Sequence, residues 1–245
     1  MNERTIAATI VAVGIALGGL AVGNGFARAK SADRSVTVKG VTEREVRADL
    51  AIWPIHIVTS DNDLATAHKR LESSVTGVRQ FLVANGLDTA GLSLSGFSVN
   101  DAQANEYGGD RRVANRFILK QTLILRSSSV DKVLAASQRV ADLASAGVNF
   151  SSGQGEGGET GGGPTFIFSG LNSLKPQMIA DATARAHEAA EQFARDSHSA
   201  LGGIRQANQG VFEILPRDEA PGITEGSQVS KRVRVVSTVD YFLKN

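Results

Sequence analysis

Apolar and polar residues alternate along several stretches of the chain, as they do in strands that bury one face of a sheet. This pattern predicts strands at residues 35–41, 45–59, 92–100, 116–126, 148–151, 165–171, 204–215 and 229–243. Proline has no N–H to donate to a neighbouring strand. We therefore expect the strand that contains Pro54 to lie at a sheet edge or to be bulged there.

Three further segments repeat their apolar residues with the 3.6-residue period of a helix. The longest of them is also rich in alanine, the best helix-forming residue. The first follows a cap at Asp61, Asn62 or Asp63 and stops at Asn85-Gly86, the second covers residues 129–147, and the third covers residues 172–201.

The predicted helix at residues 172–201 has one face of mostly small side chains. This face is formed by Ile179, Ala182, Ala186, Ala189, Ala190 and Phe193. Gly202-Gly203 follows, and glycine commonly ends helices. Because small side chains let a helix backbone lie close to a sheet, we expect this helix to dock onto β-structure, with its histidines on the solvated side.

Taken in order, the predicted elements run β-β-α-β-β and then α-β-β-α-β-β. Hairpin strands outnumber clear β-α-β crossovers, which favours the α+β class. We predict antiparallel sheets with about three packed helices in one domain, residues 30–245, after an N-terminal hydrophobic helix. The domain could consist of two similar ββαββ-like halves.

Residues 1–29 are predicted to be a targeting or anchoring segment. No charge occurs between Arg4 and Arg28, and residues 6–22 are almost continuously apolar. As a signal peptide, the segment offers Ala27-Arg28-Ala29 as a small-x-small cleavage site. As a helix, its uncharged run of about 23 residues is long enough to cross a bilayer. We favour an inner-membrane anchor over cleavage after Ala29. In either case, we expect the rest of the chain to be exported.

The composition argues against several classes of function. The formal net charge is +1, from 26 basic and 25 acidic residues, which gives no electrostatic basis for binding nucleic acid. The chain has no cysteine, so it has neither a thiol nucleophile nor a thiolate metal site. One tryptophan and two tyrosines argue against a surface on which bases or sugars stack.

The candidates for a chemical site lie mainly on the long predicted helix. His187, Glu191 and His198 fall within about 40° on a helical wheel and could supply a His/Glu/His metal set. However, the two histidines are about 16 Å apart along the helix axis, too far to share one ion. The glycine-rich stretch 153–163 lacks Gly-Lys-Ser/Thr, and no Gly-x-Ser-x-Gly elbow occurs. We therefore assign no catalytic, cofactor-binding or metal-ligating residue, and predict that the protein is not an enzyme.

The other titratable residues have structural interpretations. His56 is expected in a strand and His68 near an apolar helix face, each packed or half exposed. A solvated strand face is expected to carry the remaining basic groups, with a lipid- or partner-binding patch as the alternative. These groups are Arg111-Arg112 and the run Lys231, Arg232 and Arg234, which alternates with valines.

Three stretches resemble the SIMPL domain family, exported bacterial proteins of poorly known function that include a 26 kDa periplasmic immunogen. They are SVTVKGVTEREVRADLAIWPIHI near the start, ADATARAHEAAEQFARDSHSALGGI in the long helix and its exit, and VSKRVRVVSTVDYFL at the end. In the helix, the likeness is carried by Ala180, Ala184, Arg185, Ala189, Glu191, Ala194, Leu201 and Gly202. The resemblance implies an exported α+β domain that forms homo-oligomers and has no established catalytic residues. Some members are linked to envelope or oxidative stress.

We therefore expect a non-enzymatic, self-assembling periplasmic protein that needs no cofactor. Its contacts would come from edge strands, at Pro54 and near the C-terminus, and from the alanine-rich helix. One alternative is a small-ligand or lipid-binding envelope protein with a pocket between sheet and helices. A metal-dependent hydrolase is the other.

Overall fold

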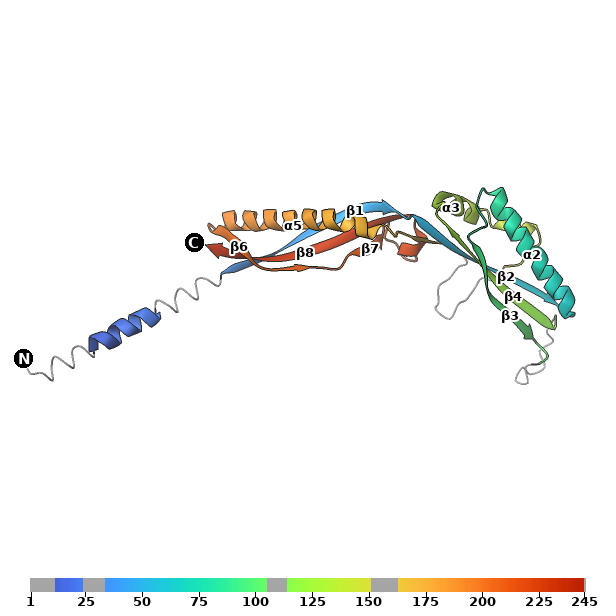
Figure 1. Cartoon of the computed structure of the whole chain (residues 1–245), viewed down its shortest axis with the longest axis horizontal. Coiled ribbons are helices and arrows are strands. Elements are labelled where there is room, and N and C mark those ends of the chain that lie inside the picture. Colours follow the sequence, from blue (N-terminus) through green and yellow to red (C-terminus); the bar gives the residue numbers. More distant parts are fainter. Residues whose placement is uncertain (1–11, 24–33, 105–113, 151–162, 245) are drawn as a thin grey trace, which may run out of the picture. The chain divides into compact units, whose positions relative to one another are not determined.

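The computed structural model describes residues 12–23, 34–104, 114–150 and 163–244 (Figure 1). Residues 12–23 are helical. The strands are β1 (Ser35–Arg47), β2 (Leu50–Asp61), β3 (Leu92–Asp101), β4 (Phe117–Ser127), β5 (Thr165–Ile167), β6 (Ala200–Gln209), β7 (Glu213–Pro216) and β8 (Ser230–Lys244). The helices are α2 (Leu64–Ala84), α3 (Val130–Gln138), α4 (Ala141–Ser145) and α5 (Leu171–Asp196), and η1 (Glu225–Ser227) is a 3₁₀ turn. Helices packed with two four-stranded sheets confirm the α+β class.

The described residues form two compact units that interleave along the chain. The first unit takes residues up to Glu43, then Leu174–Glu213, and then from Arg234 onward. The second unit takes Arg44–Ser173 and Ile214–Val233. The units are therefore not an N-terminal half followed by a C-terminal half, because β1 and β8 contribute residues to both.

The first sheet has the strand order β1-β8-β6, and β7 also pairs with β8. Helix α5 runs along this sheet (Figure 1). At Gly40 on β1, an added Cβ would lie 1.8 Å from the carbonyl oxygen of Ala182, so helix and strand backbones approach closely. The predicted docking of the alanine-rich helix onto β-structure is confirmed. The buried stripe consists of Met178, Ala182, Ala186, Ala190 and Ala194.

The buried side of α5 differs in part from the predicted one. Ala182, Ala186 and Ala190 are buried as predicted, whereas Ala189 is exposed and Phe193 is 48% exposed. Alanines occupy several sides of this helix, so apolar spacing alone does not identify the side that packs. The close approach at Gly40 decides it.

Helix α5 ends before the predicted stop at Gly202-Gly203, and those glycines lie inside β6. His198 has a φ of 53°, the left-handed conformation that glycine usually takes after a helix. The N–H of Ser199 donates to the carbonyl of Ala194, and the N–H of His198 donates to that of Arg195. These are the two bonds of a Schellman motif. The predicted stop was wrong because a histidine closes this helix.

The second sheet has the strand order β3-β4-β2-β5 and is antiparallel. Alternate residues of β2 and β4 are buried, which gives the sheet one apolar face. Helices α2 and α3 cover this face (Figure 1). Its core contains Trp53, the only tryptophan of the chain, at 1% exposure. The buried residues of α2 are Ala67, Leu71, Ser74, Val78 and Leu82.

Pro54 lies in a strand that is interior to this sheet. Strand β2 pairs with β4 along its length but with β5 only at Leu50–Ile52. The N–H of Val58 points away from β4 and donates to Asn149. Because every second N–H of a strand points to the same side, the nitrogen of Pro54 also faces away from β4, beyond the end of β5. The strand is an edge only locally, and no bond to β4 is lost.

Several predicted features fall outside the described residues. They are most of the segment 1–29, the pair Arg111-Arg112, and all but the last residue of the glycine-rich stretch 153–163. Among the helices that the structure describes, none combines the length and the apolar character needed to cross a membrane.

Candidate functional site: a groove beside an edge strand

Strand β3 is an outer strand of the second sheet. It pairs with β4, and the strand order places no other described strand on its opposite side. Every one of its residues is at least partly exposed, including Leu94 and Phe97 at 54% and Val99 at 46%. Its first nine residues, LSLSGFSVN, contain neither a charge nor a proline, two features that commonly protect sheet edges. The predicted edge near the C-terminus was wrong, because β8 lies between β1 and β6.

A β-bulge places the apolar side chains of β3 on one face of the sheet. Leu94 pairs with Leu123 and Val99 pairs with Leu119, and both partners are buried on the face that α2 covers. In a regular strand, Leu94 and Val99 would point to opposite faces, because an odd number of positions separates them. The bulge between Ser95 and Ser98, with Gly96 at a φ of 62°, adds the residue that restores the common face.

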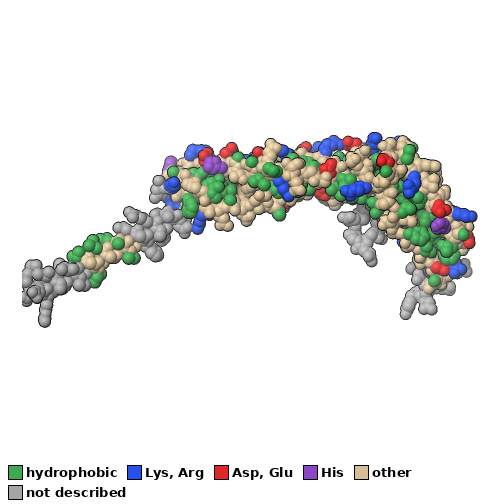
Figure 2. Space-filling view, in the orientation of Figure 1, with side chains coloured by type: hydrophobic (Ala, Val, Ile, Leu, Met, Phe, Trp, Pro, Cys, Tyr) green, Lys and Arg blue, Asp and Glu red, His purple; other side chains and the backbone are tan. Residues whose placement is uncertain are grey.

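Helix α2 and strand β3 border an open groove of about 660 Å³. Figure 2 shows hydrophobic side chains gathered on the surface where α2 and β3 lie in Figure 1. The amide of Gln121 donates to the carbonyl of Ser95 over 2.7 Å, so this polar group of the lining already has a protein partner. The lining consists of His68, Leu71, Glu72, Val75 and Thr76 from α2, Leu94 and Phe97 from β3, and Gln121 from β4.

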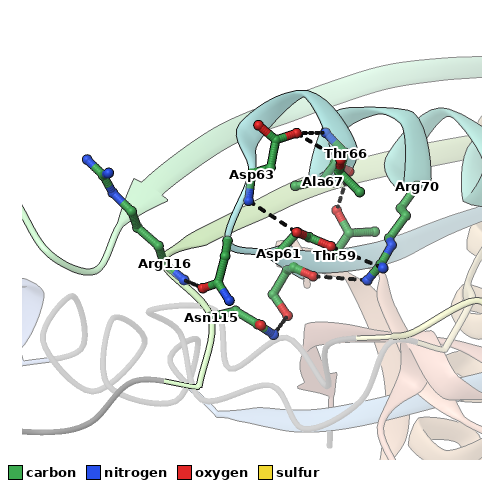
Figure 3. Close-up of polar contacts among 10 residues, drawn as sticks. Thr59, Asp61, Asp63, Thr66, Ala67, Arg70, Asn115 and Arg116 are labelled. Atoms are coloured by element: carbon green, nitrogen blue, oxygen red, sulfur yellow. Dashed lines mark hydrogen bonds and ion pairs between the residues drawn. The ribbon is translucent and has the colours of Figure 1, made fainter.

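A set of polar contacts holds the start of α2, the helical wall of the groove (Figure 3). The cap is Asp63, one of the predicted candidates, and its Oδ1 accepts hydrogen bonds of 2.8 Å from the hydroxyl and the N–H of Thr66. The bond from the hydroxyl, and next the bond from the N–H, lower the pKa of Asp63 below its ordinary value. Arg70 pairs with Asp61 over 3.1 Å. These contacts fix the first turns of α2 against the end of β2.

A second set of contacts joins the ends of β3 and β4. The guanidinium of Arg116 donates to both carboxylate oxygens of Asp101 over 2.9–3.2 Å. This pairing is the main cause of the lowered pKa of Asp101. The backbone N–H of Arg116 donates to the side-chain oxygen of Asn62 over 3.0 Å (Figure 3). In both sets, the charged and polar groups pair with one another and hold the ends of β2, β3 and β4 to the start of α2.

The metal candidates on α5 are not brought together. His187 Nε2 lies 3.3 Å from Glu191 Oε1, and about half of each side chain is exposed. The ring of His187 also contacts that of Tyr241, with centroids 5.6 Å apart. His198 lies beyond the helix, in the Schellman motif. In the part of the chain that the structure describes, no group of three or more His, Asp or Glu side chains could hold a metal ion.

His56 and His68 lie in the second unit. His56 is half-buried, and its Nδ1 is 3.0 Å from the hydroxyl of Thr122. The side chain of His68 is about half exposed, at 53%, and lies at the groove, 3.8 Å from Glu72. Both agree with the expected packed or half-exposed positions.

Lys231 departs most from expectation, because it was predicted on a solvated face and is completely buried. Its ammonium pairs with the carboxylate of Glu225 and donates to the backbone carbonyl of the same residue, in η1. Arg232 and Arg234 are partly exposed. Alternation along β8 indicates that the strand has two faces, but it does not reveal that η1 folds over one of them.

The sequence analysis did not single out the groove, although two local signals point to it. Gly96 interrupts an alternating strand, which is a typical signal of a bulge. The serines and apolar residues of LSLSGFSVN lack the charges that usually mark an exposed edge.

One comparison with known proteins identifies the family. The SIMPL family model, described as a protein of unknown function (DUF541), matches residues 36–237. The match begins in β1 and ends in β8, so it covers most of the described elements. No match was found among curated proteins. The resemblance seen in the sequence is confirmed, and the chain belongs to the SIMPL family.

Proposed function

We propose that this protein is a non-enzymatic component of the bacterial cell envelope that acts by self-assembly. In this proposal it is exported to the periplasm and held in the inner membrane by residues 6–22. Cleavage after Ala29, which would release it, is the alternative. Its proposed role, linked to envelope or oxidative stress, is to build a homo-oligomer that needs no cofactor and binds no nucleic acid.

The observation that carries the self-assembly proposal is the exposed edge of β3. No described strand pairs with its outer side, which presents backbone donors and acceptors, and its α2 face carries three partly exposed apolar side chains. Such an edge readily accepts another strand. The absence of charge from residues 92–100 leaves this edge open to association.

The non-enzymatic part of the proposal is supported by the polar groups around the groove. Asp61, Asp63 and Asp101 each accept from a neighbour that is fixed in the same unit. The carboxylates there are therefore engaged in holding elements together.

Sedimentation of the full chain in a mild detergent tests the self-assembly. We expect a species of two or more chains at micromolar protein concentration. A single-chain species throughout that range would contradict the proposal. Intact mass of the protein recovered from its native membranes distinguishes a retained N-terminal segment from cleavage after Ala29.

The groove also favours a second candidate function, the binding of a small apolar ligand or lipid. Its volume of about 660 Å³ falls within the range of about 300–1,000 Å³ common for ligand pockets. Thermal unfolding with and without a long-chain fatty acid tests this candidate, because a ligand that binds only the folded state raises the midpoint. Thr76→Arg, in the groove, should abolish the shift, whereas Ser73→Arg, exposed elsewhere on α2, should keep it.

A further inference from the structure

We propose that two copies of this chain pair edge to edge through β3, antiparallel and about a two-fold axis. The second sheet of each copy then continues into that of the other. This inference rests on the proposed self-assembly and names its contact. The evidence is the order of residues in β3 and the position of its bulge.

Strand β3 is complementary to its own reversed copy. When the two bulges face each other, Leu94 lies opposite Val99 of the second copy. In the same register, Ser95 lies opposite Ser98, and Ser93 opposite Asn100. In these three pairs, apolar side chains meet apolar ones and polar side chains meet polar ones, whereas at the strand ends Leu92 lies opposite Asp101. A two-fold axis produces each of these contacts twice.

Because of the bulge, residues that lie opposite each other in the two copies of β3 project from the same face of the joined sheet. Directly opposite residues of an antiparallel pair project from the same face. Leu94 and Val99 both lie on the α2 face, whereas Ser95 and Ser98, which pair with Thr122 and Lys120, lie on the other. A shift of one residue would set α2-face positions against outer-face positions. Only the register with opposed bulges pairs the whole strand with its faces in agreement.

At the centre of this register, Phe97 lies opposite Gly96 of the second copy. Glycine leaves space beside it that an aromatic ring on the neighbouring strand can cover. Phe97 is 54% exposed in the single chain and lines the groove. Pairing would cover this ring from the open side of β3 and bring the two grooves together across the axis.

The charge pattern of β3 favours a second copy as the occupant. In this two-fold register, each residue from 93 to 100 lies opposite another residue of the same stretch, so the charge carried by the stretch decides whether the two copies repel each other. Residues 92–100 carry no charge, and the carboxylate of Asp101 is already paired with Arg116 in its own chain. The edge therefore meets itself without electrostatic repulsion.

The absence of cysteine from the chain allows a direct test. Two full-length variants, Ser95→Cys and Ser98→Cys, are purified separately, mixed and oxidised mildly. The proposal predicts a disulfide-linked dimer in the mixture, because these positions are opposite each other and a disulfide needs Cα atoms within about 7 Å. Either variant alone should link several-fold less, because like positions lie about 10 Å apart along the strands.

Ser93→Cys mixed with Ser95→Cys is the matched control. All three serines are exposed residues of the same strand face. In the proposed register, positions 93 and 95 lie about 17 Å apart along the strands, so this mixture should not link. Equal linking in all mixtures would indicate random collision and would overturn the proposal.

The outcomes also separate this inference from the proposed function. No link in the mixture, with an oligomer in sedimentation, would overturn the β3 contact and leave self-assembly standing. No link with a single-chain species would overturn both.

A charge exchange gives an independent readout. Leu94→Arg and Val99→Asp should each reduce the self-association measured by sedimentation, because each sets an unpaired charge against an apolar side chain of the second copy. A mixture of the two variants should regain it, because the new charges are then opposite and of opposite sign. A mixture no more associated than either variant alone would count against the register.

Discussion

Lys231 has no exposed surface, yet it carries an ammonium group. A charge that is removed from water is stable only when a partner compensates it. In the described structure, Glu225 provides that compensation twice, with its carboxylate and with its backbone carbonyl. This contact holds η1 to β8 within the second unit.

We predict that Glu225→Gln destabilises the protein by about 1–3 kcal/mol, because the buried ammonium of Lys231 loses the carboxylate that compensates its charge and keeps only neutral acceptors. Replacing both groups, with Lys231→Met and Glu225→Gln together, should recover much of this loss, since a flexible apolar side chain fills similar space without a charge. Urea unfolding of the two variants and the wild type measures the difference. A double variant no more stable than the single one would show that the charge is not the cause.

Asp101 gives the protein a predicted sensitivity to acid. The pairing with Arg116 lowers its folded-state pKa below the ordinary value of 3.8. The unfolded chain therefore binds the proton more readily, and the stabilisation, which is present above about pH 4, is lost as pH falls through the folded-state pKa. The contribution of Asp63 to stability changes with pH in the same direction, because the hydrogen bonds from Thr66 lower its folded-state pKa.

We expect Asp101→Asn to lower the urea midpoint at pH 7 and to have a smaller effect at pH 3, because below the ordinary pKa of 3.8 the unfolded wild-type chain takes up the proton and part of the stabilisation is lost. Arg116→Gln removes the same pair from the other side and should give the same pH dependence. A difference between wild type and Asp101→Asn that is equal at both pH values would contradict this assignment.

At the scale of the element, the packing of α5 depends on small residues on both partners. Four alanines spaced four positions apart form most of its buried stripe. Gly40 on β1 lies beneath them, with the carbonyl of Ala182 and the N–H of Ala186 closest to it. A larger residue at Gly40 cannot be accommodated by a side-chain rotation, because the atoms it would meet belong to the helix backbone.

Gly40→Ala should therefore destabilise the protein by about 1–3 kcal/mol, the usual cost of overpacking. Its added Cβ would lie 1.8 Å from Ala182 O and 2.6 Å from Ala186 N. Gly203→Ala in β6 is the matched control, since nothing lies within 4 Å of its added Cβ. The measurement is the midpoint of thermal unfolding of the two variants. Equal midpoints would contradict the close approach of β1 to the backbone of α5.

At the scale of the whole molecule, the path of the chain joins the two units. Strands β1 and β8 each contribute to both, and β8 is the middle strand of the first sheet. Its buried residues in the first unit include Val235, Val239 and Tyr241. Neither unit can be cut out as one continuous segment.

We predict that a chain ending at Gln228 does not form the first sheet. The deletion removes Val233, Val235, Val239, Tyr241 and Leu243, all buried. At about 1.5–3 kcal/mol for each buried apolar side chain, the loss is comparable with the whole stability of a domain, about 5–15 kcal/mol. A chain that begins at residue 34 keeps all eight strands that the structure describes and is the control. The two shortened chains are compared by circular dichroism and by the cooperativity of their unfolding. A cooperative transition in the chain that lacks β8, equal to that of the control, would contradict the prediction.

Local pattern predicted most of the elements. The alternation at residues 229–243 and the period of residues 64–82 each correspond to an observed strand or helix. Asn85-Gly86 ends α2 as expected, because the signal for a helix stop lies in adjacent residues. The closure of α5 at His198 was missed, since a histidine in the left-handed conformation carries no such signal.

The groove could not be predicted from local sequence patterns, because its walls come from separate parts of the chain. Leu71 on α2 and Phe97 on β3 meet only when both pack against β4. Gly96 indicated a possible bulge, but the face to which Phe97 turns depends on the register with Gln121 and its neighbours.

The sequence by itself determined the α+β class, the alanine-rich helix and the SIMPL membership, because period, propensity and motif are properties of neighbouring residues. Tertiary structure alone decided that β8 is interior and β3 is an edge, that Lys231 is buried, and that the units interleave. Strand order and burial depend on which distant segments pair. The pairing of distant segments is set by the packing energy of the whole chain, and no single segment contains enough information to predict it.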